Sequence, residues 1–217
     1  MIPLKDINPT RSFPFVNVML ISANVLVFLY QITLSPVAAK AFVLANATVP
    51  ARIPAFLAGH APASVALFPL FSSMFLHGGL MHLLGNMLFL YIFGDNVEDT
   101  FGHIGYLFFY LLCGIGSGLI HVLFNWGSGI PALGASGAIS GVMGAYAVMF
   151  PKHQILTFFL IFLIPVPAIL ILGYWFVLQF VAGINGLGMA TAGGVAWWAH
   201  IGGFLMGVVI AWVVKKR

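Results

Sequence analysis

Four polar residues set in apolar sequence have the types and the spacing of a hydrolytic site. Ser136 and His200 lie in two different apolar stretches, and His82 and Asn86 lie one helical turn apart in a third. A serine hydroxyl is a weak nucleophile until a base takes its proton, and imidazole has a pKa suited to that task near neutral pH. Ser136 is therefore the candidate nucleophile and His200 the candidate general base.

Acyl transfer also needs hydrogen-bond donors aimed at the oxyanion that develops on the substrate carbonyl. The Asn86 amide, the His82 imidazole and the backbone N–H of Ser136 can each donate. His82 and Asn86, at i and i+4, project from one face of a helix. Ser136 opens an apolar stretch, where a helix presents unpaired N–H groups and the positive end of its dipole. These groups form a candidate oxyanion hole.

The composition places these residues in a membrane protein. Hydrophobic residues make up 62% of the chain and charged residues 6%, whereas soluble domains carry about 45–50% and about 25%. The 217 residues leave room for six or seven helices of about 20 apolar residues and for no separate soluble domain. We therefore expect one all-α domain over residues 1–217, embedded in the lipid bilayer.

The charged residues and the cysteine content narrow the function classes further. Cys113 is the single cysteine, which excludes an intrachain disulfide and a multi-cysteine metal site. The net charge of +4 comes from residues at span ends, in loops and at the C-terminus, an ordinary membrane pattern that does not indicate nucleic-acid binding. The chain lacks a His-Glu-x-x-His motif, and we expect no metal site.

Hydropathy divides the chain into six expected spans, at about residues 13–34, 79–93, 101–124, 136–150, 155–182 and 195–214. Residues 35–69 contain several prolines and are too broken for one clean helix. The second span could begin as early as residue 71, and we expect it to end in an acidic turn at residues 94–99. Pro165 and Pro167 should kink the fifth span.

A signal peptide is the competing interpretation of the first span. Its apolar core should run for only about 7–15 residues before a small-residue cleavage site. The stretch at residues 13–34 is longer, although Val37-Ala38-Ala39 resembles such a site. A retained span is the better prediction.

With six spans, both termini and the loops after spans two and four share one side of the membrane. That side holds most of the basic residues, namely Lys5, Arg11, Lys152, Lys215, Lys216 and Arg217. The other side holds only Lys40 and Arg52, so the positive-inside rule places both termini in the cytoplasm. Spans two, four and six then start at the outer face, and the four site residues lie at similar depth near it. Costly polar groups at one depth predict a shared pocket.

The predicted positions of the spans disfavour other residues as the base that activates Ser136. Lys152 lies sixteen residues after Ser136, which is about 24 Å along a helix. The acidic residues all fall on the cytoplasmic side, namely Asp6, Asp95, Glu98 and Asp99. The sequence therefore predicts a Ser-His dyad without a carboxylate that orients the histidine.

The chain resembles the rhomboid intramembrane serine proteases of the minimal six-helix prokaryotic type over nearly its whole length. The resemblance rests on Gly134-Ala135-Ser136-Gly137 in span four and on Ala199-His200-Ile201, followed by Gly203 and Gly207, in span six. It also rests on the sequence His-Gly-Gly-Leu-Met-His-Leu-Leu-Gly-Asn at residues 77–86. Each piece alone is common, but their order and spacing together are specific.

The resemblance implies that Ser136 is the nucleophile, that His200 is the general base, and that His82 and Asn86 are oxyanion donors. It implies hydrolysis of peptide bonds in or beside transmembrane helices of membrane-protein substrates, often at a small residue and without a cofactor. Residues 35–69 would form the membrane-embedded first loop of the family, and span five together with the loop after it would act as the substrate gate. The expected location is a prokaryotic cytoplasmic (inner) membrane.

The chain departs from the family pattern at two places. Phe68-Pro69 stands where many relatives carry a Trp-Arg pair in the first loop. Ser140, one turn after the serine, stands where relatives often carry an aromatic ring that stacks on the catalytic histidine. His77, within the span-two segment, is expected to order the loop and not to take part in catalysis.

Two function classes other than a protease make different demands on the sequence. A rhomboid-like pseudoprotease would bind transmembrane helices without cutting them, but it should lack the serine or the histidine, and both are present. A small transporter would use the same polar groups as a pathway, but it would need polar groups that continue to the inner face. Spans four and six are largely apolar beyond this layer.

Overall fold

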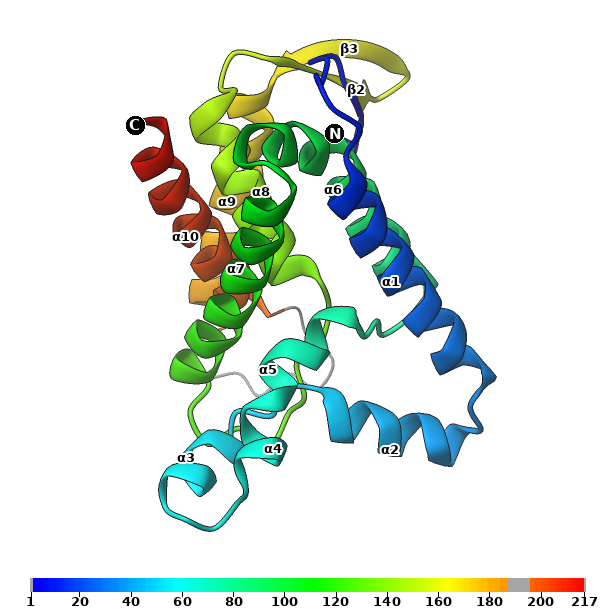
Figure 1. Cartoon of the computed structure of the whole chain (residues 1–217), viewed down its shortest axis with the longest axis vertical. Coiled ribbons are helices and arrows are strands. Elements are labelled where there is room, and N and C mark those ends of the chain that lie inside the picture. The colour runs from blue at the N-terminus through cyan, green and yellow to red at the C-terminus, as the bar shows by residue number, and fades with distance from the viewer. Residues whose placement is uncertain (1, 187–195, 217) are drawn as a thin grey trace.

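Six helices among the described residues form a bundle, and the helix that begins with Ser136 lies at its centre. The computed structural model describes residues 2–186 and 196–216. The six helices are α1 (Phe15–Thr33), α6 (Leu80–Phe101), α7 (His103–Phe124), α8 (Ser136–Met149), α9 (Ala168–Asn185) and α10 (Trp197–Lys215). In α8, 11 of 14 residues are buried, and this helix contacts α6, α7, α9 and α10. It is the central helix of the bundle (Figure 1).

The lengths and hydropathies of these helices suit a membrane. Among the described residues, α1, α7, α9 and α10 are each long and apolar enough to cross a bilayer. The α6 helix meets the same test together with the short helices over Ala63–Phe75, from which it is bent by 77°. With α8, which is shorter and enclosed by its neighbours, they account for the expected six-helix bundle.

Glycines let α8 and α10 approach each other backbone to backbone. A methyl group at Gly203 would overlap the Gly137 carbonyl, and one at Gly207 would overlap the Gly141 carbonyl. On the facing helix, a methyl group at Gly144 would overlap the carbonyl of Phe204. Small residues at four-residue spacing are the usual means of such contact between membrane helices. This glycine seam sets the distance between the helices that carry Ser136 and His200.

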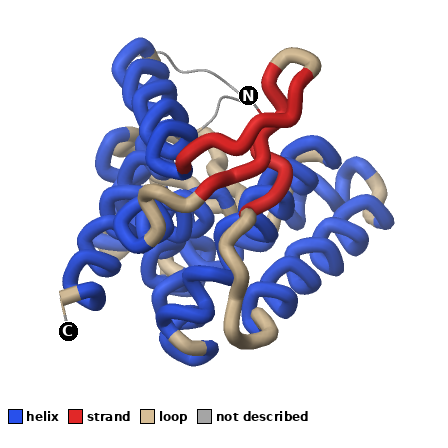
Figure 2. The backbone as a smooth tube through the Cα atoms, turned by 90° about the horizontal axis from the view of Figure 1, so that it is seen from above, coloured by secondary structure: helices blue, strands red, loops and turns tan. Residues whose placement is uncertain are grey.

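A small sheet at one end of the bundle was not expected from the sequence. Strands β1 (Ile2–Asp6), β2 (Gln154–Phe159) and β3 (Phe162–Pro167) are antiparallel in the order β1-β2-β3. Figure 2 shows the three strands together across the helix ends. The prediction of one kinked helix over residues 155–182 is therefore wrong before Ala168.

The composition of residues 154–167 explains this hairpin. Phenylalanine, isoleucine and threonine favour strands, whereas Pro165 and Pro167 break a helix. Both prolines lie on β3, an edge strand of the sheet, where a missing N–H does not interrupt a ladder. The helix of the fifth span begins only after them, at Ala168.

The acidic turn expected at residues 94–99 is also absent, because α6 runs through it to Phe101. The carboxylate of Glu98 accepts hydrogen bonds from the backbone N–H groups of Val16 (2.8 Å) and Asn17 (2.7 Å) in the first turn of α1. Asp99 accepts from the Ser12 hydroxyl at 2.7 Å. These acids cap a neighbouring helix. The break falls at Gly102, whose φ of +71° suits glycine.

Residues 35–69 form short helices, as their prolines predict. These are α2 (Pro36–Asn46), α3 (Arg52–Leu57), α4 (Ala63–Ala66) and α5 (Phe68–Ser72), followed by the 3₁₀ helix η1 (Ser73–Phe75). Thr48 anchors this segment, because its backbone pairs with Ala132 and its hydroxyl donates to the Pro69 carbonyl at 3.0 Å. Figure 1 places α2, α3 and α4 at one end of the bundle and both chain ends with the sheet at the other.

Candidate active site

Ser136 and His200 are within hydrogen-bonding distance of each other. The Oγ atom of Ser136 lies 2.7 Å from Nε2 of His200, although 64 positions separate the two residues in sequence. Ser136 is the first residue of α8 and His200 lies in the first turn of α10. The glycine seam brings these two turns together. His200 is buried, whereas Ser136 is partly exposed at the surface of the bundle.

The second ring nitrogen of His200 has a partner that sequence reasoning missed. Nδ1 of His200 lies 2.7 Å from Oε1 of Gln179 on α9. One turn earlier on the same helix, the Trp175 ring lies 5.9 Å from the imidazole, tilted by 35°. The signal in the sequence was a lone glutamine within an apolar span, since such polar groups rarely face lipid.

Ser140 does not take the place of the family's aromatic ring. Its hydroxyl donates to the Ser136 carbonyl at 2.6 Å, which is the local backbone bond that serines in membrane helices often make. The aromatic contact with His200 comes from α9 instead, through Trp175. The departure at Ser140 is therefore accompanied by a different support for the histidine.

His82 and Asn86 lie beside the loop that leads into Ser136. A Cβ atom placed on Gly134 would lie 2.8 Å from Nε2 of His82 and 3.6 Å from Nδ2 of Asn86. Gly134 has a φ of +123°, and its N–H donates to the Ser73 carbonyl at 2.9 Å. Only glycine combines this backbone conformation with such close approach. The structure thus brings all four expected residues to one region of the bundle.

The hydrogen bonds around His82 and Asn86 leave donors free. The backbone N–H of Gly78 donates to Nδ1 of His82 at 3.4 Å, which leaves the proton of the neutral ring on Nε2, the nitrogen near Gly134. Nδ2 of Asn86 is buried and has no hydrogen-bond partner among the described residues. A buried donor without a partner is costly, and here it lies beside the loop of the candidate nucleophile.

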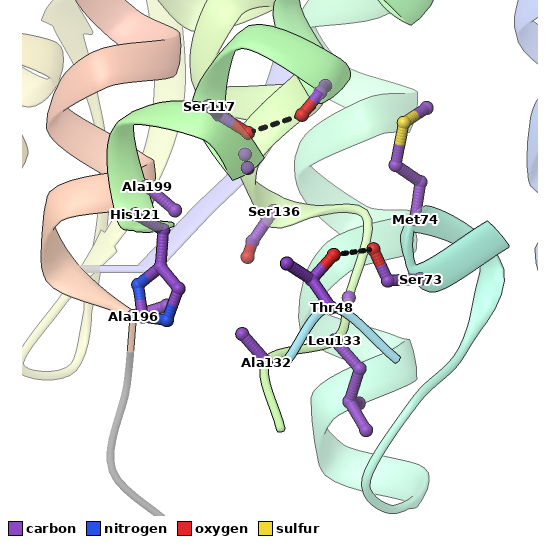
Figure 3. Close-up of a pocket in the computed structure, with 14 residues that line it drawn as sticks. Thr48, Ser73, Met74, Ser117, His121, Ala132, Leu133, Ser136, Ala196 and Ala199 are labelled. Carbon is purple, nitrogen blue, oxygen red and sulfur yellow. Dashed lines mark hydrogen bonds between the residues drawn. The ribbon is translucent and has the colours of Figure 1, made fainter. Parts of the chain in front are cut away.

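A small cavity of about 40 Å³ opens next to Ser136. Figure 3 shows the Ser136 side chain pointing into the space between His121 and Thr48. Besides Ser136, its polar lining comprises Thr48, Ser73, Ser117 and His121. Neither Ser117 nor His121 is among the site residues predicted from the sequence. Both lie on α7 beside glycines that open the space, a proximity that the sequence does not display.

Comparison with known proteins identifies sequence relatives of this chain. The model of the rhomboid domain matches residues 65–217. Rhomboid protein 1, mitochondrial, of Saccharomyces cerevisiae is 33% identical over 151 residues, which are 66% of this chain and 41% of that protein. RHOMBOID-like protein 2 of Arabidopsis thaliana is 36% identical over 149 residues, 68% of this chain and 42% of that protein.

A third relative, Rhomboid-like protein 11, chloroplastic, of Arabidopsis thaliana, is 31% identical over 162 residues. The match covers 70% of this chain and 54% of that protein. The chain thus spans about half the length, or less, of these relatives.

Proposed function

Since this chain belongs to the rhomboid family, we propose that it is a serine protease that hydrolyses peptide bonds in or next to transmembrane helices of other membrane proteins. The family match and the apolar helices both indicate that the chain is a multi-pass integral membrane protein. The observation that carries the proposal is the 2.7 Å separation of Ser136 Oγ and His200 Nε2 inside an apolar bundle. The family also has inactive members, so this pair is what argues for catalysis.

In the proposed reaction, His200 acts as base and then as acid. Nε2 takes the Ser136 proton as Oγ bonds to the carbonyl carbon of the scissile peptide. The tetrahedral intermediate collapses as the imidazolium gives that proton to the leaving amine, which leaves an ester on Ser136. Water then attacks the ester carbonyl as Nε2 of His200 takes a proton from it. The second tetrahedral intermediate releases the carboxylic acid as the imidazolium returns that proton to Ser136 Oγ. No metal or other cofactor is needed.

The negative oxygen of the intermediate would be stabilised by three donors. Asn86 supplies an Nδ2–H that has no other partner among the described residues, and His82 supplies the Nε2–H that its bond from Gly78 leaves free. The N–H of Ser136, in the first turn of α8, has no carbonyl partner within its helix. Donors that are already in place need no reorganisation as the charge forms.

The cavity beside Ser136 supports a preference for small residues at the cleavage site. Its volume of about 40 Å³ accommodates a methyl-sized side chain or a few water molecules, since one water occupies about 10–15 Å³ by this measure. A phenylalanine side chain would not fit without movement of the lining. The hydroxyl of Ser117 and the imidazole of His121 are polar groups that could hold the water used in the second step.

We infer that the substrate helix approaches the site beside α9. This helix carries few buried residues, and its Trp175 and Gln179 side chains lie against His200. A helix with few buried residues loses few packing contacts when it moves sideways.

The membrane and orientation remain those expected from the sequence. We propose a prokaryotic cytoplasmic membrane with both termini in the cytoplasm. Two of the relatives named above carry mitochondrial or chloroplastic in their names, and that describes those proteins. The partners would be membrane proteins with transmembrane helices.

The first test is labelling with a fluorophosphonate in mild detergent, which needs no knowledge of the substrate. The wild-type protein should be labelled, whereas Ser136→Ala and His200→Ala should not, and both variants should remain folded. Ser35→Ala is the matched control, because its hydroxyl caps α2 and does not contact His200. Labelling of Ser136→Ala would refute the assignment.

Cleavage of a transmembrane substrate in liposomes completes this test. Either variant should lower the turnover number at least about 10³-fold, because the two residues act as a unit. A folded wild-type protein that neither takes the label nor cleaves would favour a protein that binds helices without cutting them. Solute flux through the same liposomes would instead support a transporter.

A further inference from the structure

We propose that Gln179 orients His200, taking the place that an aspartate has in a Ser-His-Asp triad. The inference rests on the proposed function, and it adds a positioning residue that acts through the histidine. The geometric basis is that His200 lies between two oxygens, with Oε1 of Gln179 at 2.7 Å from Nδ1 and Oγ of Ser136 at 2.7 Å from Nε2.

The amide oxygen decides which ring nitrogen carries the proton. A neutral imidazole has one N–H and one nitrogen that accepts, and a carbonyl oxygen can only accept. Nδ1 of His200 therefore donates to Gln179, and Nε2 keeps its lone pair for the Ser136 proton. A base needs this tautomer, and its loss in a triad costs about 10⁴-fold in turnover.

A neutral partner suits this location better than a carboxylate. His200 and Gln179 are each 8% exposed, and burying an ionised group among apolar helices is costly unless it is fully paired. An amide offers the same acceptor geometry without a charge. It stabilises the imidazolium less than a carboxylate would, so its removal should cost less than removal of a triad aspartate.

Three successive turns of α9 hold this acceptor in place. Trp175 lies against the His200 ring, and Gln179 follows at i+4 with the hydrogen bond. Gly183 follows at i+8, where a Cβ atom would lie 3.3 Å from Cδ1 of Ile201 on α10. These spacings place the three residues on one helix face. The close approach at Gly183 brings the amide within reach of the ring.

The position of Gln179 on α9 has a mechanical consequence. Ser136 and His200 are held together by the glycine seam of α8 and α10, but the orienting oxygen belongs to a third helix. Displacement of α9 would break the bond to Nδ1 while the two reacting residues stay close. His200 is therefore held in the tautomer that a base needs only when α9 is in the position seen in this structure.

The test compares Gln179→Leu, which has a similar size but no acceptor, with Gln179→Glu, which keeps one. In liposomes, Gln179→Leu should lower the turnover number about 10- to 100-fold with KM changed less than about twofold. Gln179→Glu should recover most of the loss. Leu178→Ala is the control on the same helix, since Leu178 is exposed. Wild-type turnover in Gln179→Leu, or equal loss in both variants, would overturn the proposal.

A second readout does not depend on proteolysis. In ¹⁵N-histidine NMR spectra, the His200 resonances are identified by their loss in His200→Ala. They should show a proton on Nδ1 in the wild-type protein and in Ser136→Ala, and a mixed tautomer in Gln179→Leu. If the wild-type protein shows this pattern but does not cleave, the proposed function is wrong and the orienting role of Gln179 is still supported. A proton on Nε2 in the wild type would refute the orienting role itself.

Discussion

At the scale of single residues, the two candidate donors on α6 are held differently. Asn86 is buried with an Nδ2 that has no partner among the described residues, whereas His82 is exposed and is fixed by the Gly78 N–H. Asn86 is thus the less solvated donor. Because electrostatic stabilisation is worth more away from water, we expect Asn86 to contribute more than His82.

Asn86→Ala should slow turnover about 10- to 1,000-fold, with a smaller change in KM, because the lost donor acts on the transition state. The measurement is steady-state cleavage of a transmembrane substrate in liposomes. Asn46→Ala is a suitable control, since its side chain donates to the Phe42 carbonyl on α2. An unchanged rate in Asn86→Ala would remove this residue from the oxyanion role.

At the scale of secondary-structure elements, the α8–α10 seam is the feature on which the dyad depends. Both helices carry glycines where any side chain would meet the backbone of the other helix. In contrast, α9 contributes the proposed orienting residues Trp175 and Gln179 but no part of the seam. The distance between Ser136 and His200 and the tautomer proposed for His200 therefore depend on different elements.

Gly207→Ala should destabilise the protein by about 1–3 kcal/mol, the usual cost of overpacking a tight interior, because the added methyl group meets the Gly141 backbone. Thermal unfolding in detergent would measure this. Gly85→Ala is the matched control, since Gly85 lies in α6 and no atom of the described part of the chain is within 4 Å of an added Cβ. It should be neutral or stabilising by up to about 1 kcal/mol. Equal melting temperatures for both variants would contradict the role of the seam.

At the scale of the whole molecule, the two ends of the bundle differ. The sheet and both chain ends lie together, and α2, α3 and α4 lie at the opposite end (Figure 1). Lys5 and Lys152 belong to the sheet end, where they lie on or next to the strands. This arrangement agrees with the even number of spans inferred from the sequence and with a cytoplasmic sheet end.

Cysteine labelling tests this orientation in intact cells. In a Cys113→Ala background, Lys40→Cys should react with a membrane-impermeant maleimide added outside, because Lys40 is an exposed residue of α2. Lys152→Cys should react only after the cells are opened. Both positions are exposed, so each serves as the control for the other. Reaction of both from outside would contradict the six-span topology.

Local patterns in the sequence were enough for much of this protein. Composition indicated a membrane bundle, and hydropathy predicted six helices, of which the fifth begins at Ala168 and not at residue 155. Prolines predicted the broken segment at residues 35–69. The Gly-Ala-Ser-Gly motif and the i, i+4 pair His82 and Asn86 pointed to one region, and in the structure both side chains lie beside Gly134 of the motif. These features depend on residues near one another in the chain, so a single sequence displays them.

Tertiary structure decided the features that depend on partners distant in sequence. The acidic residues after Phe93 stay helical because Glu98 caps α1, more than 80 positions away. Residues 154–159 form a strand that pairs with the N-terminal segment as well as with β3. Gln179 meets His200 only because α9 is rotated to face it. Helix rotation and strand pairing are set by packing between elements, and hydropathy along one chain does not report them.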